Sequence, residues 1–414
     1  MKIAIVGSGI SGLVTAYLLS QDHDITVYEA ANYIGGHTNT VSVELKGRNY
    51  EVDTGFIVYN EKNYPNFVKL LDQLEVPNQP TNMSFSVRCI ITGLEYNGTS
   101  INKLFAQRSN LLRPSFYRMI KDILRFNRDT KQFLKSENLK LTFGEFLEKG
   151  NYSPQLREDY AIPMTSAIWS GSPSQVLNTP FYFIARFYEN HGMLNINDRP
   201  QWRVIKKGSR QYVVRLVERF QDQIRLQCPV KRIVRSKDGV EISSSDGKAS
   251  QFDTVILATH SDQALEILEK PSPAEIEILG AIRYQKNEAV LHWDDSLLPK
   301  KKLAWAGWNY HKMPDSPNGT SVTYNMNILQ GIESESTFCV SLNMTDKIDP
   351  TKLIKTFIYS HPVFSGNAIE AQKRLGEING ANRTYFCGAY WGSGFHEDGV
   401  NSALNVCRYF GKGL

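Results

Sequence analysis

The glycine pattern within the first twelve residues constrains the fold of this 414-residue chain more than any other feature. Residues 2–6 (KIAIV) form a short apolar run, which is typical of a buried parallel strand. The sequence GSGISG follows at residues 7–12, and the next residues, LVTAYLLS, have the apolar spacing of a helix. Gly7 allows a tight turn, Gly9 lets the backbone approach a pyrophosphate, and Gly12 lets the helix pack closely on the sheet. A strand, this loop and a helix in that order predict a Rossmann-type dinucleotide site.

The end of the second expected strand carries an acidic residue. Residues 24–28 (DITVY) are expected to form that strand, and Glu29 and Ala30 follow it. A carboxylate at this position accepts hydrogen bonds from the ribose hydroxyls of a dinucleotide and repels a 2′-phosphate. We therefore expect NAD or FAD and not NADP, while a solvated acid at a strand end would give the same pattern.

Three further segments favour FAD over NAD. A second glycine turn follows Glu29, and an expected strand at residues 50–53 runs into another glycine loop. The last thirty residues contain a strand, a glycine-rich loop and a helix that is expected to begin at residues 399–403. A nicotinamide enzyme has no need to bring its C-terminal segment back to the cofactor. The residues expected at the cofactor from these segments, with two from the first loop, are Ile10, Ser11, Gly35, Gly36, His37, Thr38, Thr54, Gly55, Phe56, Gly388, Tyr390, Gly399, Val400 and Ala403.

With these motifs in place, the chain resembles the flavoprotein superfamily of monoamine oxidases, protoporphyrinogen oxidases and phytoene desaturases. In that superfamily the N-terminal dinucleotide motif, the GG-[RH] turn and the C-terminal glycine loop contact FAD. The resemblance extends to residues 255–260 (VILATH), where it implies that Ala258 and Thr259 lie beside the cofactor. It also includes residues 228–233 (CPVKRI), where it implies that the backbone of Val230 receives the adenine. We expect non-covalent FAD, since Cys387 precedes the C-terminal loop.

A narrower resemblance concerns the segments GFIVYNEKNYPNF, NMSFSV, SINKLFAQ and SAIWSGSP. Together they resemble the FAD-binding proteins fused to, or encoded beside, cyclopropane-fatty-acid synthases. This implies an FAD-dependent oxidase, desaturase or dehydrogenase that accepts a hydride from an unsaturated or methylated fatty acyl chain. Two alternatives stay open: a flavin-dependent double-bond isomerase of fatty acids, and a non-catalytic flavoprotein that holds lipid for a methyltransferase partner.

The order of the motifs predicts a discontinuous α/β fold. We expect a Rossmann-like FAD-binding domain of the glutathione-reductase type to comprise residues 1–80, 201–262 and 376–414. A substrate domain is expected to supply a helical cap at residues 81–200 and a mixed or antiparallel sheet at residues 263–375. Runs such as EAVLHW and TFCVSLNM in the last segment alternate as in an antiparallel sheet.

Charge is concentrated in one segment of the expected cap. The whole chain has a formal net charge of +5, which predicts no nucleic-acid partner, whereas residues 101–140 hold ten Lys or Arg against three acids, a net charge of +7. Apolar residues recur there with helical spacing. A basic amphipathic surface suits an enzyme that takes lipid from an anionic bilayer. A solvated helix face over a buried stripe gives the same pattern, and the sequence leaves both interpretations open.

Several classes of protein are not expected. No apolar run reaches the roughly 18 residues of a membrane span, and the glycine motif begins too early to follow a cleaved signal. Five cysteines, spread singly, argue against a disulfide framework. We expect a cytoplasmic protein, either free or peripheral at the inner membrane face. Scattered histidines without an HExxH motif predict no metal site, and a GxSxG elbow and a Walker-type phosphate loop are both missing.

Four residues are candidates for chemistry at the open face of the flavin: His396, Tyr324, Asn325 and Trp169. An imidazole titrates near neutral pH, so His396 could move a proton, or it could cap the helix that follows. The aromatic candidates could equally form the pocket wall. The sequence shows no clear pair of tyrosines of the kind that cages an amine nitrogen, and we therefore do not expect an amine substrate.

Overall fold

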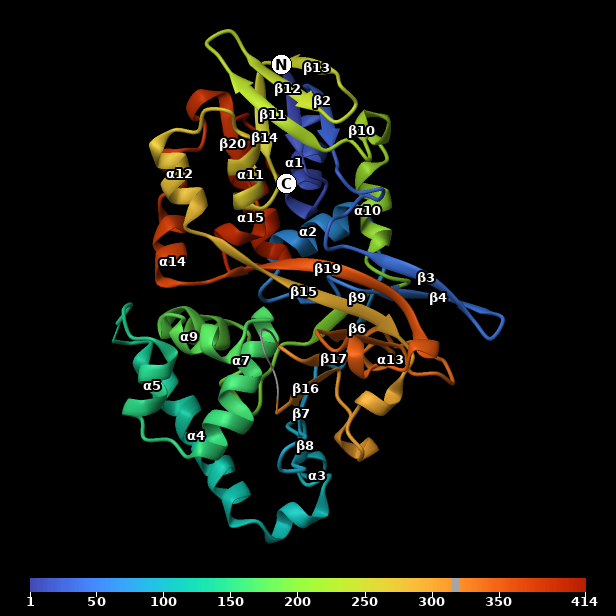
Figure 1. Ribbon diagram of the computed structural model, residues 1–414, viewed down its shortest axis with the longest axis vertical. Helices are drawn as coiled ribbons and strands as arrows, with labels where there is room; N and C mark the ends of the chain where they lie inside the picture. The colour runs from blue at the N-terminus through green and yellow to red at the C-terminus, as the bar shows by residue number, and fades with distance from the viewer. Residues whose placement is uncertain (137, 315–319) are drawn as a thin grey trace.

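The computed structural model describes residues 1–136, 138–314 and 320–414 and contains a nucleotide-binding half and a substrate half (Figure 1). The nucleotide-binding half is built on a five-stranded parallel sheet with the order β10-β2-β1-β14-β20. Its strands are β1 (Lys2–Val6), β2 (Asp24–Tyr28), β10 (Ile224–Arg225), β14 (Thr254–Leu257) and β20 (Thr384–Phe386). The strands that we predicted at both ends of the chain therefore meet in one sheet.

Both faces of this sheet are buried, as the apolar run in β1 predicts. Ile3 and Ile5 pack with α1 (Ile10–Leu19) and α15 (His396–Arg408) on one face. Ala4 and Val6 point the other way and pack against a three-stranded antiparallel sheet. That sheet consists of β11 (Val230–Arg235), β12 (Val240–Ser244) and β13 (Ala249–Phe252). Burial on both faces explains why β1 lacks polar alternation.

The substrate half contains a seven-stranded sheet with the order β19-β15-β18-β17-β16-β7-β8. Its strands are β7 (Phe85–Cys89), β8 (Glu95–Asn97), β15 (Arg283–His292), β16 (Trp308–Lys312), β17 (Val322–Asn325), β18 (Cys339–Leu342) and β19 (Leu353–Val363). The long strands β15 and β19 pair with each other and connect the two halves (Figure 1). The pairs are antiparallel except for β7 with β16, which confirms the expected mixed or antiparallel sheet, and the pairs among β15–β19 are all antiparallel.

The helical cap begins later than expected. Residues 85–97, which we placed in the cap, form strands β7 and β8, and helices follow only from residue 101. The remaining strands are β3 (Thr40–Leu45), β4 (Arg48–Asp53), β5 (Val58–Asn60), β6 (Asn78–Thr81) and β9 (Trp202–Ile205). The cap helices are α3 (Ile101–Leu104), α4 (Pro114–Phe133), α5 (Phe143–Lys149), α6 (Pro154–Leu156), α7 (Ile162–Trp169), α8 (Pro173–Asn178) and α9 (Phe181–Asn190), with the short helix η1 (Arg108–Leu112) between α3 and α4.

Aromatic packing holds the cap together. Phe126 of α4, Phe146 of α5 and Phe181 of α9 are buried in one cluster, and the rings of Phe146 and Phe181 stack with centroids 3.8 Å apart. The other helices are α2 (Pro65–Gln73), α10 (Arg210–Val217), α11 (Ser261–Ile267), α12 (Pro273–Gly280), α13 (Met326–Gln330) and α14 (Gly366–Lys373). Within the described ranges, every helix is too short or too polar to cross a bilayer. The five cysteines are unpaired and buried.

Candidate functional site

A cavity of about 730 Å³ lies at the carboxyl ends of β1, β2 and β14, where an open α/β sheet places its ligand site. Its wall combines residues from the first sixty positions, from the segment around Val230 and Ala258, and from the C-terminal loop. The substrate half closes the other side through α7 and β16–β19. Segments far apart in the sequence therefore share one cavity, which is within the size range of small-molecule and cofactor sites.

The three glycines of the first loop differ in how much space their surroundings would leave for a side chain. Gly7 has a φ of +105°, and a Cβ there would lie 2.7 Å from the carbonyl oxygen of Ala258. A Cβ on Gly12 would lie 2.0 Å from the carbonyl oxygen of Gly7, so this glycine is needed for packing. A Cβ on Gly9 would meet no atom within 4 Å, although Gly9 lies on the cavity wall beside the start of α1. The open space at Gly9 fits a pyrophosphate bound at a helix N-terminus.

Glu29 lies on the cavity wall at the end of β2, where a ribose is expected. One carboxylate oxygen accepts hydrogen bonds from the Ser8 amide at 2.9 Å and the Ser8 hydroxyl at 2.6 Å. The other oxygen accepts from the Ala31 amide at 2.7 Å. The carboxylate therefore fixes the glycine loop as well as facing the cavity, a role that the sequence did not reveal.

His396 lies on the cavity wall and is held there by hydrogen bonds and ring stacking. The Nε2 atom of His396 lies 3.0 Å from the Thr38 hydroxyl and 3.1 Å from the Tyr212 hydroxyl, and these two hydroxyls are 2.6 Å apart. The His396 ring stacks on Phe56 with centroids 3.4 Å apart. Burial lowers the pKa of His396 well below its usual value, with a smaller contribution from His37. His396 is therefore neutral with one ring nitrogen engaged, which favours positioning over proton transfer.

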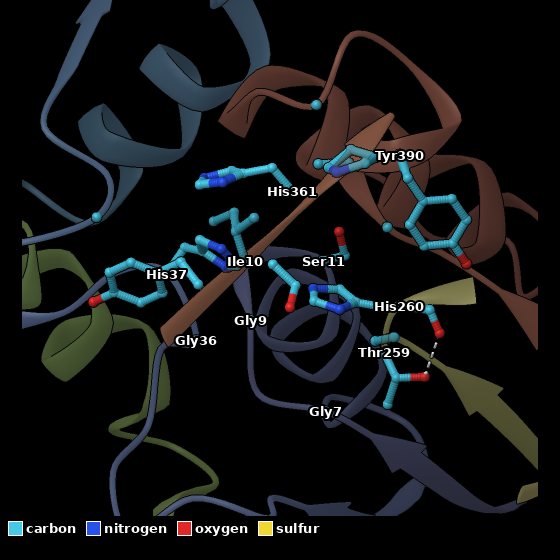
Figure 2. A pocket seen from close by; sticks show the side chains of 18 of the residues that line it. Gly7, Gly9, Ile10, Ser11, Gly36, His37, Thr259, His260, His361 and Tyr390 are labelled. Carbon is cyan, nitrogen blue, oxygen red and sulfur yellow. Dashed lines mark hydrogen bonds between the residues drawn. The ribbon is translucent and has the colours of Figure 1, made fainter. Parts of the chain in front are cut away.

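Three more histidines surround the same space, and we refer to them with His396 as the cavity histidines. Figure 2 shows His37, His260 and His361 around the space next to Gly9, Ile10 and Ser11. Burial lowers the pKa of His37 and of His260 to about 4 and that of His361 to about 3, and each is lowered further by a neighbouring histidine. The imidazoles are therefore neutral at pH 7 and can act as hydrogen-bond donors and acceptors.

His361 is the best oriented of these rings. Its Nδ1 atom lies 3.0 Å from the Asn287 amide nitrogen, while the Asn287 oxygen accepts from the Asn343 amide at 2.9 Å. The Asn287 amide thus donates to Nδ1, and this assigns the His361 proton to Nε2. The result is a neutral donor on the cavity wall.

The substrate side of the wall is aromatic and apolar. It includes Trp169 of α7, Trp308 of β16 and Tyr324 of β17, and the Trp308 and Tyr324 rings meet edge to face at 5.2 Å. The Trp169 indole donates to the Ser393 carbonyl at 3.1 Å, which ties the cap to the C-terminal loop. The Trp308 indole nitrogen is buried and has no hydrogen-bond partner among the described residues.

Most of the predicted cofactor residues lie on this wall. They are Gly7, Gly9, Ile10, Ser11, Glu29, Ala30, Gly35, Gly36, His37, Thr54, Gly55, Phe56, Val230, Ala258, Thr259, Gly388 and Tyr390. Of the catalytic candidates, His396, Tyr324 and Trp169 also line it.

Six predicted residues lie behind the wall. Thr38 holds His396, and Gly12 packs on Gly7. Asn325 caps α13, because its side chain accepts from the Ile328 amide at 3.2 Å. The other three are Gly399, Val400 and Ala403, which pack against α1 because α15 begins at His396 and not at Gly399 as expected.

Several wall residues were missed by the sequence interpretation, among them Tyr359, His361 and His260. Tyr359 and His361 alternate along β19 and so share a face, and His260 follows Thr259 directly. Only the position of His260, next to a recognised motif, could have indicated it from sequence. The described residues contain no group of three or more His, Cys, Asp or Glu side chains that could hold a metal ion.

Comparisons with known proteins agree with this geometry. The family described as flavin containing amine oxidoreductase matches residues 10–302. The Mycobacterium tuberculosis protein AofH, named as a flavin-containing monoamine oxidase, is 22% identical over 318 residues, which are 74% of this chain and 65% of the relative. This chain thus spans about 65% of the length of that curated relative.

Two solved structures share the fold. Cyclohexylamine oxidase from Brevibacterium oxydans has a TM-score of 0.70 at 15% identity and covers 99% of both chains. The CLA-producing fatty acid isomerase from P. acnes has a TM-score of 0.70 at 17% identity and covers 99% of this chain and 98% of its own. At these identities the similarity establishes the architecture alone.

Proposed function

The chain belongs to the flavin-containing amine oxidoreductase family, and from this premise we propose that it binds FAD non-covalently in the cavity and oxidises a fatty acyl chain. The proposal of a flavin cofactor rests on membership of this family. The substrate class is our own inference from the wall of the cavity.

The observation that carries the substrate proposal is the lack of charge on the substrate side. Among the described lining residues, the Asp, Glu, Lys or Arg side chains are Glu29, Lys231 and Glu266. All three belong to the nucleotide-binding half, because α11 and α12, which we expected in the substrate domain, pack into the core of that half. The substrate half contributes Trp169, Trp308 and other aromatic, apolar or neutral polar groups. A protonated amine would lose its hydration there without gaining a carboxylate partner, whereas an acyl chain would lose only unfavourable contact with water.

FAD, when bound, supplies the two-electron acceptor for a C–H bond of the substrate. The residues of this chain supply position and surroundings. The space at Gly9 and the carboxylate of Glu29 would hold the pyrophosphate and ribose, and Phe56 with His396 would fix the wall at the other end. The largely apolar wall of the substrate half disfavours water, and the His361 N–H group is a donor that could orient a polar group of the substrate.

Support for an acyl substrate also comes from the resemblance to proteins associated with cyclopropane-fatty-acid synthases. The P. acnes fatty acid isomerase, which has the same architecture, favours double-bond isomerisation as a second candidate function. In an oxidation, two hydrogens leave adjacent carbons of the chain and an external acceptor removes the electrons from the flavin. In an isomerisation, a hydrogen leaves one carbon and returns to another, and no electrons leave the protein.

Anaerobic flavin absorbance distinguishes these possibilities. Purified holoprotein is mixed with phospholipids that carry unsaturated or methylated acyl chains, and cyclohexylamine serves as the amine control. Lasting bleaching by the lipid supports oxidation, while a shifted double bond in the product without lasting bleaching supports isomerisation. Bleaching by the amine and not by lipid would contradict the acyl proposal. Neither spectral nor chemical change with any acyl chain would favour a flavoprotein that holds lipid for a methyltransferase.

A further inference from the structure

Strands β7 and β8, helix α3 and the start of α4 lie at one end of the substrate half (Figure 1). The β7–β8 turn, α3, η1 and the start of α4 expose large apolar side chains. Leu112 is 88% exposed, Ile101 80% and Ile91 61%, although residues of these types are usually buried. We call the whole set the apolar tip, and it comprises Ile90, Ile91, Ile101, Leu111, Leu112 and Tyr117.

The apolar tip rests on ordered structure. The Gln107 side chain donates to the Gly93 carbonyl at 2.9 Å, which fastens the chain between α3 and η1 to the β7–β8 turn. The Tyr117 hydroxyl donates to the Leu111 carbonyl at 3.0 Å, which fastens η1 to α4. Beneath these segments, Phe116 and other buried residues already form a filled core. The exposed side chains are therefore not the remainder of an incomplete core.

Five basic residues lie in or beside α3, η1 and the first part of α4, which carry most of the apolar tip. Residues 101–121 contain five Lys or Arg and no Asp or Glu. None of these five has a carboxylate partner within the described part of the chain, whereas the next basic residue, Arg125, pairs with Asp122 at 3.1 Å. Glu137, which we counted in the wider basic segment, lies outside the described residues. The five are Lys103, Arg108, Arg113, Arg118 and Lys121.

We propose that the apolar tip and its five basic residues form a surface that binds an anionic lipid bilayer. Nucleic acid would neutralise the five basic side chains but leave the exposed leucines and isoleucines in water. Anionic headgroups would pair with the basic side chains while the membrane interface takes up the apolar ones, so of these two partners the bilayer satisfies both features. This surface does not depend on the flavin chemistry, although it would bring the cavity to a source of acyl chains.

Vesicle sedimentation with paired variants of the holoprotein tests the proposal. Vesicles of phosphatidylcholine are compared with vesicles that also contain phosphatidylglycerol, at low and high salt. Arg118→Glu/Lys121→Glu should weaken binding to the anionic vesicles by at least about 25-fold, at about fivefold for each lost basic residue near the membrane. Leu111→Ser/Leu112→Ser should weaken binding to both vesicle types.

The matched control removes exposed apolar groups from the nucleotide-binding half. Val214→Ser/Ile276→Ser, at positions that are 58% and 51% exposed, should bind vesicles as the wild type does. All variants should keep the wild-type flavin content and melting temperature, which shows that they are folded. Equal, salt-insensitive binding to both vesicle types would overturn the proposal, as would unchanged binding by the charge-reversed variant. If sedimentation velocity instead showed that Leu111→Ser/Leu112→Ser converts a dimer into a monomer, the surface would be an interface with a second copy of the chain. The proposal would then be wrong.

Discussion

Substituting alanine for two glycines of the first loop should separate cofactor binding from packing. At Gly9 a new Cβ meets no protein atom within 4 Å, and the backbone φ of −69° suits alanine. The free energy of unfolding of the FAD-free protein should therefore change by no more than about 1 kcal/mol. At Gly12 the new Cβ would lie 2.0 Å from the Gly7 carbonyl oxygen, so the chain must move. That overlap should cost about 3 kcal/mol or more, at the upper end for overpacking.

Cofactor affinity should respond to Gly9→Ala even though stability does not. The added methyl group occupies the space that we assign to the pyrophosphate and would cost about one charge-assisted hydrogen bond, worth about 1.5–3 kcal/mol. This corresponds to FAD binding that is roughly 10- to 100-fold weaker. Urea unfolding of the FAD-free protein and titration of FAD fluorescence measure the two effects separately. Wild-type FAD affinity in Gly9→Ala, or a stability loss equal to that of Gly12→Ala, would refute this reasoning.

Three further predictions follow from named contacts. Glu29→Ala should remove bound FAD while the protein stays folded with a loosened Ser8 loop, and a flavin content equal to wild type by absorbance would show that the ribose is misplaced. Gly399→Ala should lower the free energy of unfolding by about 1–3 kcal/mol, because its Cβ would lie 2.6 Å from Ile10, while Gly98→Ala, which meets nothing, serves as the control in urea titrations. For the cavity histidines, the folded pKa lies below the unfolded value of about 6.5, so the unfolded chain binds more protons below that pH. Their contribution to the free energy of unfolding should therefore be complete above pH 6.5 and should decrease as the pH falls towards 4, by at most about 1.4 kcal/mol per histidine per pH unit. Melting temperatures that stay constant over this range would contradict the assigned neutral state.

The parts of the site that could be predicted from sequence are those whose function depends on neighbours in the chain. A strand, a glycine loop and a helix are local features, so β1 and α1 were predicted correctly. The position of Glu29 follows in the same way, because it directly ends β2.

The parts that could not be predicted depend on long-range pairing. Tyr359 and His361 face the cavity only because β19 pairs with β15 along its length, and the sequence does not specify that register. Strands β7 and β8 are short, and their place in the sheet is set by the parallel pairing of β7 with β16. The start of α15 was placed three residues late because the Asp398 side chain, and not a serine or threonine at the first position, bonds the Phe395 amide at 3.0 Å.

The central claim is that three distant stretches of one chain enclose a single FAD. Titration of the purified protein with FAD, followed by absorbance and by fluorescence quenching, tests it most directly. We predict saturation at one FAD per chain, with a yellow protein that releases the intact cofactor on denaturation. A colourless protein that neither quenches FAD fluorescence nor retains the cofactor after gel filtration would contradict the account.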